Sequence, residues 1–269
     1  MQATSLRAES LLPQGYSSAR LSDPDGLREA DALYRRVFGY EDPAFSLNPN
    51  LLSSLCHHGG SSVGVFNELR ELVGYAYGFA GLDDGQPFHF SQAAVVDERQ
   101  QGRGLGRALK YLQAEDAARA GHREMRWTFD PLLVRNAHFN LDSLQAVGVG
   151  FLPRYFERPE SDRILVNWRL PADASRERRP KPTPPPTLGR SRWGTAVAGD
   201  DNDTWIPLPA DSTTVPAEVR SRVSELIAET LRATFDQRRA LIGCSLVSDD
   251  TAAYLAVPRE SLGREQEHS

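Results

Sequence analysis

Residues 93–110 read AAVVDERQQGRGLGRALK, and they hold the loop QGRGLG, Gln101–Gly106, between an apolar strand pattern and an amphipathic helix pattern. Glycines let a backbone approach an anion closely and turn several N–H groups toward it, and a helix N-terminus adds a partial positive charge. The chain has a formal net charge of -5, yet four cations accompany the loop: Arg99, Arg103, Arg107 and Lys110. This local excess of positive charge is typical of a site for a ligand with several phosphates.

Two common phosphate-binding motifs do not fit this loop. A P-loop, GxxxxGK[ST], counted from Gly102 requires its second glycine at the position of Arg107, and no GKS or GKT follows. The dinucleotide fingerprint GxGxxG, counted from the same glycine, also meets Arg107 where its third glycine belongs. A glycine turn without a ligand is the remaining alternative, although alternate glycines weaken a helix start and need some backbone reason.

Strand and helix patterns alternate around the loop over residues 16–170, which predicts one α/β domain. Strands are expected at 17–21, 62–66, 72–79, 88–96, 125–129, 149–155 and 163–170. Helices are expected at 27–38, 50–58, 105–120 and 136–147. Residues 1–15 form an N-terminal tail.

The rest of the chain divides into a spacer, a small segment and a tail. Residues 171–203 contain RERRPKPTPPP and few apolar residues, which predicts a polyproline spacer, with an SH3-type ligand as the alternative. Residues 204–258 read strand, helix, strand, strand, an order similar to the opening of the first domain, so a partial internal repeat is one interpretation. At about 55 residues this segment is marginal alone. We expect it to pack on the first domain or, in a homodimer, on a second copy; residues 259–269 are a tail.

The loop resembles the acyl-CoA-binding motif of the GNAT superfamily, QxxGxG or RxxGxG, with Gln101, Gly104 and Gly106 at its fixed positions. Three segments are similar to uncharacterised bacterial predicted acetyltransferases of that superfamily: FHFSQAAVVDERQQGRGLGRALK (88–110), WTFDPLLVRNAHFNLDSLQAVGVGF (127–151) and DRILVNWRL (162–170). The resemblance covers about residues 16–170. It implies a GNAT fold, of class α/β (α+β), with a mixed, mostly antiparallel central sheet flanked by helices. The small C-terminal strand–helix–hairpin segment is an addition to this fold.

The resemblance also implies the activity and its co-substrate. An N-acyltransferase of this kind moves an acyl group, acetyl by default, from acyl-CoA directly to the amine of a small molecule, with peptide or protein amines as alternative acceptors. The coenzyme pyrophosphate would lie on the loop amides, and the pantetheine arm would pair with a strand backbone as β-augmentation does. The residues implied are Ala94, Val95 and Val96 for the arm, Gln101, Gly102, Arg103, Gly104, Leu105, Gly106 and Arg107 for the phosphates, and Asn136 for either. Asn136 as a helix cap is the alternative.

Three side chains are candidates for proton transfer. Asp130 ends the fifth strand and is the first candidate for the base, with a turn cap beside Pro131 as its alternative role. His89 shares a strand face with Ser91 and could line the pocket, although a hydrogen-bonded core histidine is the commoner role. The helix NAHFNLDSLQAVG lacks the tyrosine that many GNAT sequences use as an acid, and Tyr155 on the next strand is a substitute candidate. That missing tyrosine motivates an alternative function, a non-catalytic acyl-CoA sensor or regulatory module.

Composition excludes several other classes. Charged residues at 25% and hydrophobic residues at 40% are those of a soluble protein, and no apolar run approaches the ~18 residues that a membrane helix needs. The N-terminus has no export signal, so we expect a cytoplasmic protein. Cys56 and Cys244 lack metal-ligand spacing, which predicts neither a metal site nor a disulfide. The net charge argues against a nucleic-acid partner, with RERRPKP as a basic arm the weaker alternative.

Overall fold

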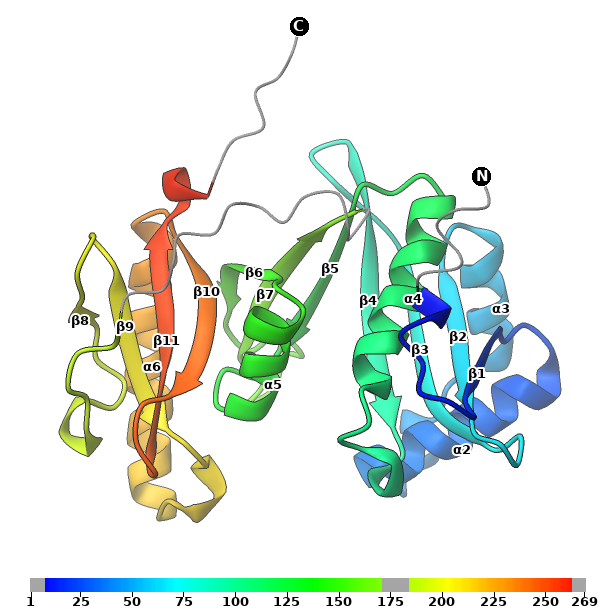
Figure 1. Ribbon diagram of the computed structural model, residues 1–269, viewed down its shortest axis with the longest axis horizontal. Helices are drawn as coiled ribbons and strands as arrows, with labels where there is room; N and C mark the ends of the chain where they lie inside the picture. Colours follow the sequence, from blue (N-terminus) through cyan, green and yellow to red (C-terminus); the bar gives the residue numbers. More distant parts are fainter. Residues whose placement is uncertain (1–7, 171–183, 263–269) are drawn as a thin grey trace, which may run out of the picture. The chain divides into compact units, whose positions relative to one another are not determined.

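The structure is a computed structural model that describes residues 8–170 and 184–262 (Figure 1). Its described residues form two compact units. The first contains residues 8–127 with 169–170, and the second contains residues 128–168 with 184–262. None of the helices in these ranges is long and apolar enough to cross a membrane.

The first unit is built on a twisted sheet of five strands: β1 (Ser17–Arg20), β2 (Ser61–Phe66), β3 (Leu72–Asp83), β4 (Gln86–Val96) and β5 (Glu124–Phe129). The strands follow the order β1-β2-β3-β4-β5, and β5 continues into the second unit. All neighbours are antiparallel except β4 and β5, which are parallel. The sheet is therefore mixed and mostly antiparallel.

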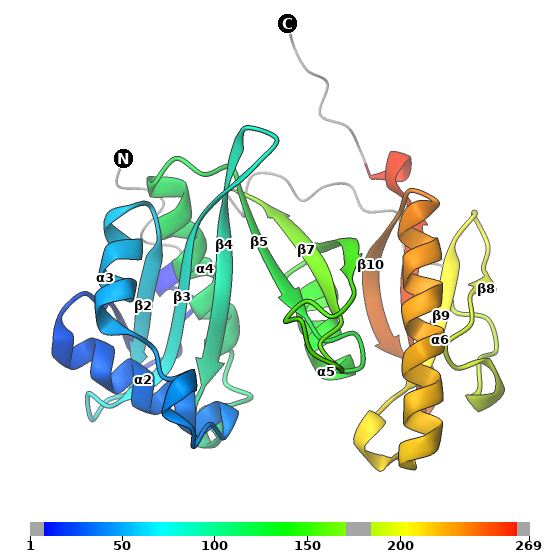
Figure 2. The ribbon, with the colours of Figure 1, turned by 180° about the vertical axis from the view of Figure 1, so that it is seen from behind.

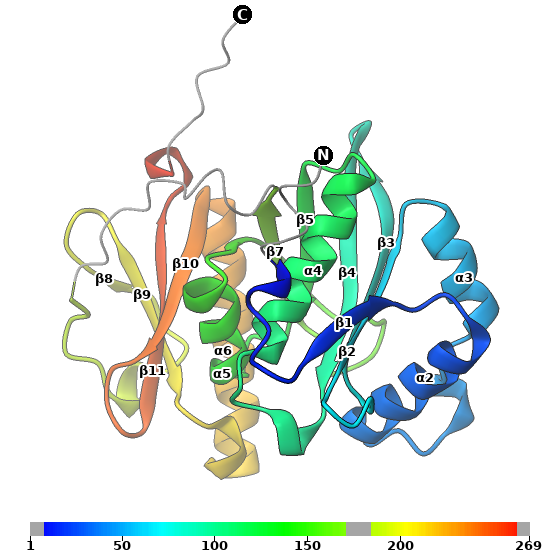
Figure 3. The same cartoon turned by 45° about the vertical axis from the view of Figure 1, so that its right-hand side comes forward.

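Helices cover both faces of this sheet. On one face, α2 (Pro24–Phe38) and α3 (Pro49–His57), joined through the 3-10 turn η1 (Pro43–Phe45), bury Leu27, Leu33 and Leu52 (Figure 2). On the other face, the turn η2 (Glu98–Gln100) leads into α4 (Leu105–Arg119), whose Leu105, Leu109 and Leu112 pack on β2 and β3 (Figure 3). Local signals set the helix limits: the Asp23 side chain caps α2, which ends at the left-handed Gly39 with φ 67°.

The strands of the second unit follow the order β7-β6-β10-β11-β9-β8, and all neighbouring strands in this order are antiparallel. Its strands are β6 (Val147–Leu152), β7 (Arg163–Arg169), β8 (Val197–Ala198), β9 (Thr204–Pro209), β10 (Arg239–Leu246) and β11 (Thr251–Pro258). Its helices are α5 (Val134–His138), the π-helical turn η3 (Phe139–Ser143) and α6 (Ala217–Asp236), with the 3-10 turns η4 (Arg190–Arg192), η5 (Ser212–Thr214) and η6 (Arg259–Ser261). Its core centres on Trp205, Ile242 and Leu255.

The expected fold class is confirmed: the structure is mixed α/β, with a mostly antiparallel sheet flanked by helices and a C-terminal strand–helix–hairpin. The expectation of a single helix over residues 136–147 is wrong. The helix runs from Val134 to His138, widens into the π-helical η3, and gives way to β6 at Val147. The widened turn brings the Asp142 carboxylate within 2.9 Å of the Cys244 amide of β10, a long-range contact that no helical period encodes.

The spacer and the repeat also differ from expectation. The segment RERRPKP lies outside the described residues, but the later part of the expected spacer buries Leu188 and Trp193 and supplies β8, which pairs with β9. In the C-terminal segment β9 pairs with β11, whereas β1 pairs with β2, the first strand after its helices. The two segments thus share an element order but not a strand pairing. Residues 128–168 pack with the C-terminal segment, whereas the sequence pattern groups them with residues 16–127.

Candidate anion-binding site

The QGRGLG loop turns through two left-handed residues at the start of α4. Gly102 has φ 78°, and Gly104, the N-cap of α4, has φ 82°. A residue with a Cβ is strained in this region of backbone space, so both positions require glycine for local reasons. A Cβ built at either position meets no atom within 4 Å, and residues 101–104 are exposed. The turn therefore faces open space.

The amides of the loop are largely uncommitted. The Gln101 amide donates to the Glu98 carbonyl at 3.3 Å, and helical bonding resumes where the Arg107 amide donates to the Gly104 carbonyl at 3.0 Å. Between them, the five amides of residues 102–106 donate to no acceptor in the described part of the chain. Successive free N–H groups at a helix N-terminus form a preorganised anion-binding nest. We call these five amides the loop amides below.

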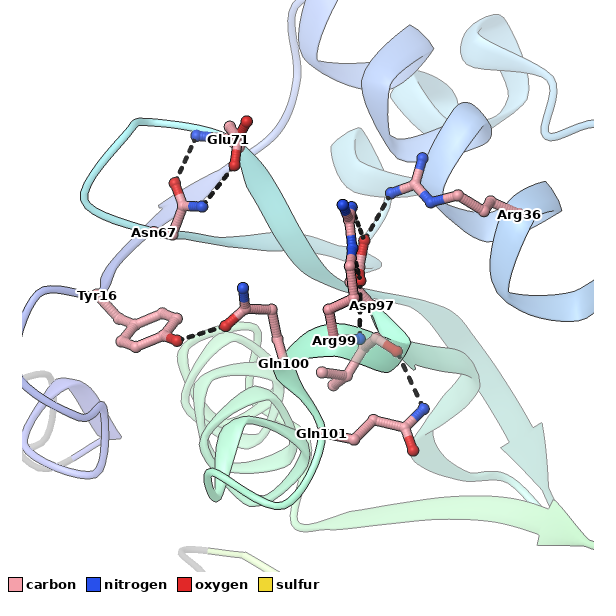
Figure 4. A network of polar contacts seen from close by, with 9 residues as sticks. Tyr16, Arg36, Asn67, Glu71, Asp97, Arg99, Gln100 and Gln101 are labelled. Atoms are coloured by element: carbon pink, nitrogen blue, oxygen red, sulfur yellow. Dashed lines mark hydrogen bonds and ion pairs between the residues drawn. The ribbon is translucent and has the colours of Figure 1, made fainter.

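A buried carboxylate fixes the entrance to the loop. Asp97, directly after β4, accepts from the Arg99 amide at 3.0 Å and from the Arg99 and Arg36 guanidinium groups at 3.0–3.1 Å (Figure 4). The Arg99 hydrogen bonds, followed by the one from Arg36, hold the pKa of Asp97 well below its usual range. Asp97 is therefore ionised at neutral pH and ties β4, η2 and α2 together.

Two further contacts support the loop. The Tyr16 hydroxyl donates to the Gln100 side chain at 2.6 Å, and the Gln101 side-chain amide donates to the Val96 carbonyl at 3.4 Å (Figure 4). Leu105, at the start of α4, is buried under the sheet. These contacts restrain the backbone on both sides of the two glycines, so the loop amides are held in place without a ligand.

The four expected cations do not share one role. Arg103 and Arg107 are exposed, and Arg107 lies 5.5 Å from the Tyr111 ring centroid. Arg99 is committed to Asp97. The expectation that Lys110 is a cation of the loop is wrong, because its side chain is buried and donates to Ser91 on β4 at 2.7 Å. Of the four expected cations, two exposed guanidinium groups, those of Arg103 and Arg107, are thus available at the loop surface.

The end of β4 offers a backbone edge. Ala94, Val95 and Val96 pair with β3, and in the described residues no strand pairs with their other edge. The shift from the pair Tyr77↔Ala93 to the pair Gly78↔Ser91 leaves Gln92 as an extra residue, a β-bulge. An edge without a strand partner in the described residues therefore runs from this bulge toward the loop, and its Val96 carbonyl accepts from the Gln101 side chain.

His89 does not line an open pocket. It is fully buried, and its Nε2 lies 2.9 Å from the Ser61 hydroxyl, which also accepts from Gln113 at 3.0 Å. Burial, followed by the nearby His122, lowers the pKa of His89 to about 4. His89 is therefore a neutral core histidine, and its expected role as a base is wrong because no solvent reaches it.

Asp130 lies in the second unit, in the turn after β5. Its Oδ1 accepts from the Leu132 amide at 2.8 Å, and its Oδ2 lies 3.9 Å from the Arg163 guanidinium. The turn-capping role beside Pro131 is thus present. Burial raises the pKa of Asp130 despite the opposing effects of the Leu132 amide and Arg163. A raised carboxyl pKa strengthens a carboxylate as a proton acceptor.

Tyr155 and Asn136 also belong to the second unit. Tyr155 lies in the turn after β6, not on a strand, because β6 ends at Leu152; burial raises the pKa of its hydroxyl. The alternative role of Asn136 as a helix cap is wrong, because the N-cap of α5 is Leu133. Asn136 is instead an exposed helical residue whose side chain accepts from Asn140 at 3.1 Å. The loop, the β4 edge and His89 thus share the first unit, while Asp130, Asn136 and Tyr155 share the second.

Sequence reasoning missed a buried polar cluster beneath α4. Ser61, Ser91, Lys110, Gln113 and His122 are all buried beside His89. A Cβ on Gly78 would lie 2.5 Å from the His89 Nε2 and 2.9 Å from the Gln113 Nε2, so this glycine makes room for the cluster. The available signal was Gln113, a polar residue four positions after Leu109 on the apolar face of the helix.

No protein-family model matches the chain, and no curated protein is significantly similar to it. Solved structures give likenesses to acetyltransferases. The ribosomal-protein-S18-alanine N-acetyltransferase from Escherichia coli is 16% identical over 56% of this chain and 92% of its own, with a TM-score of 0.45. A putative acetyltransferase from Salmonella typhimurium, solved with its cofactor acetyl-CoA, is 16% identical over 60% of this chain and 98% of its own, with a TM-score of 0.48.

A putative GNAT-family acetyltransferase from Desulfovibrio desulfuricans is similar at the same level, 16% identical over 57% of this chain and 98% of its own, with a TM-score of 0.47. Because these TM-scores are below 0.5 and the identities are low, the assignment of a function rests on the geometry of the loop and of β4.

Proposed function

We propose that this chain is a GNAT-type N-acyltransferase that moves an acyl group, acetyl as the default, from acyl-CoA to the primary amine of a small molecule. The observation that carries the proposal is the nest of loop amides at the start of α4, held open by two left-handed glycines. Such a nest suits a pyrophosphate, and the exposed Arg103 and Arg107 add charge for a further phosphate.

The β4 edge supports the placement of the rest of the coenzyme. An extended pantetheine arm pairs with the outer backbone edge of Ala94–Val96 as an added strand, with Asn136 as a further hydrogen-bonding partner. A backbone N–H on this edge polarises the thioester carbonyl, an oxyanion-hole role worth ~3 kcal/mol. Transfer within a ternary complex then needs no covalent enzyme intermediate, because binding both substrates supplies proximity.

Proton transfer is assigned to the second unit. Asp130, whose pKa is raised by burial, accepts the proton of the incoming ammonium directly or through water. Tyr155 protonates the departing thiolate. The acceptor is the amine of a small molecule, and a homodimer through the C-terminal segment remains a prediction.

The alternative function is an acyl-CoA sensor or regulatory module without catalysis. The specific observation that favours it is the lack of tyrosine in α5 and η3, together with the burial of His89. A sensor keeps the loop amides and the β4 edge but needs neither Asp130 nor Tyr155.

One assay separates the two functions. The purified full chain is mixed with acetyl-CoA and a panel of small primary amines, and the release of the CoA thiol is followed while acetyl-CoA binding is measured by calorimetry. We expect binding together with thiol release that depends on an amine. Binding without release for any amine or acyl donor supports the sensor, and the absence of binding contradicts both functions.

A further inference from the structure

Lys110 is buried, and the part of the chain that the structure describes provides no counter-ion for it. Its side chain comes from the second turn of α4 and lies against the sheet, 5% exposed. Its Nζ donates to the Ser91 hydroxyl at 2.7 Å and lies 3.9 Å from the Trp127 ring centroid. Among the described residues, no carboxylate lies within ion-pair distance of it. Burial lowers the pKa of Lys110 to about 7, because desolvation disfavours the charged form.

Lys110 lies where two strands stop pairing. The parallel strands β4 and β5 are paired at His89↔Met125 and Phe90↔Arg126, and their pairing ends after the second of these pairs. The next residue on β4 is Ser91, and the next on β5 is Trp127, so Lys110 contacts both. We call Ser91, Lys110 and Trp127 the fork; all three residues belong to the first unit.

The fork lies on β4, the strand that leads to the loop. Ser91 precedes Val96 by five residues on β4, which corresponds to about 16 Å at the rise of a strand. In the proposed function, the pantetheine arm starts at the loop amides and follows the β4 edge toward the fork. Its thioester end therefore arrives beside the Gln92 bulge and the fork. This step rests on the proposed function.

The geometry points to Lys110 as the residue that limits the acyl group to a short chain. Its amine occupies the space between Ser91 on β4 and Trp127 on β5. A longer chain extends its methylenes toward the Nζ of Lys110 and the hydroxyl of Ser91. Burying methylenes there gives little hydrophobic gain and requires the amine to give up its hydrogen bond. An acetyl group ends before that contact. Lys110 thus acts as a specificity-determining residue and carries no covalent step.

The test compares the affinities of acetyl-CoA, propionyl-CoA and butyryl-CoA by calorimetry, so it requires no known amine. We expect the wild-type chain to bind butyryl-CoA more weakly than acetyl-CoA. Lys110→Ala removes the amine and leaves room for two more methylenes of the acyl chain. The ratio of the butyryl-CoA Kd to the acetyl-CoA Kd should therefore fall by about tenfold, as expected when two methylenes become buried. Lys110→Met keeps the packing and removes the amine, and it should shift the ratio in the same direction if Lys110→Ala fails to fold.

The matched control is Gln113→Ala, because Gln113 is a buried polar residue of the same helix whose side chain donates to Ser61, a residue outside the fork. Its ratio should equal that of the wild type. The ratio does not depend on the folded fraction of a preparation, so a merely structural role would leave it unchanged. Variants that bind CoA with an unchanged ratio, or a wild type that prefers butyryl-CoA, overturn the inference while the proposed function stands. A wild type that binds none of the thioesters overturns both.

Discussion

At the scale of single residues, the site depends on backbone geometry more than on side-chain chemistry. Gly102 and Gly104 have positive φ, and their turn leaves the loop amides without acceptors among the described residues. Both glycines could be identified from the sequence, because a left-handed turn before a helix requires this residue type locally. The roles of Lys110 and His89 could not, because burial of a polar side chain depends on neighbours far along the chain.

Gly104→Glu should abolish acetyl-CoA binding. The new side chain enters the space in front of the loop amides and adds a negative charge where phosphate binds, and its Cβ also strains a residue with φ 82°. Calorimetry with acetyl-CoA measures the loss, which should exceed a hundredfold.

The matched control for that variant is Gly85→Glu. Gly85 has φ 77°, an added Cβ meets no atom within 4 Å, and it lies in the β3–β4 turn at the other end of β4. The control has the same charge change and similar backbone strain, so it should bind acetyl-CoA normally. Equal affinities for the two variants would place the coenzyme elsewhere.

Asp130→Asn should lower kcat by roughly 10²–10⁴ and leave acetyl-CoA affinity unchanged, because Asn cannot accept the ammonium proton. Asn keeps the oxygen that accepts from the Leu132 amide, so the turn survives. In the wild type the rate should fall as pH decreases through the pKa of Asp130, which burial places above the ordinary value of 3.8. Steady-state rates across pH measure both effects.

Asp211→Asn serves as the control for that measurement. Asp211 caps a turn in the second unit in the same way, accepting from the Thr213 amide at 2.9 Å, and is not assigned to the site. Its kcat should match that of the wild type. If Asp130→Asn does the same, the base is another group.

At the scale of elements, the contact between β3 and β4 positions the edge on which the coenzyme arm is proposed to lie. Gly78 lies opposite Ser91, beside the bulge, where the two backbones and the His89 side chain approach closely. The strands themselves could be predicted from their apolar patterns. The bulge could not, because it arises from the register between two strands.

Gly78→Ala should therefore destabilise the first unit by about 3 kcal/mol or more, since its Cβ would overlap the Phe90 carbonyl and approach the His89 Nε2. Urea unfolding measures the change in the free energy of unfolding. Gly150→Ala is the control, because a Cβ on that strand glycine meets only the Leu165 side chain at 3.9 Å. Similar costs for both variants would contradict the close packing around Gly78.

At the scale of the whole molecule, the division of contacts falls within β5, between Trp127 and Thr128. The second half of the segment that resembles GNAT proteins packs with the C-terminal strands. The Tyr254 hydroxyl of β11 donates to the Pro131 carbonyl at 2.7 Å, and β10 pairs with β6 at Leu241↔Gly148. The sequence pattern could not reveal this, because periodicity reports which face of an element is buried and not which element covers it.

A chain ending at residue 170 should therefore leave residues 128–168 without their packing partners. We expect those residues to exchange amide hydrogens rapidly and to be cleaved by proteases, because the truncation exposes the β6 edge and the buried surface of α5. Hydrogen exchange and limited proteolysis measure this, with a chain ending at residue 262 as the control. Full protection of residues 128–168 in the shorter chain would restore the expected domain of residues 16–170.

The sequence by itself determined the glycine loop, the succession of strands and helices and the α/β class, because these depend on local backbone preferences and on the period of apolar residues. Only the tertiary structure decided that Lys110 and His89 are buried, that the helix after Asp130 widens into a π-helical turn, and that β9 pairs with β11. Each of those outcomes depends on contacts between residues distant in the chain, whose desolvation and register no local pattern encodes.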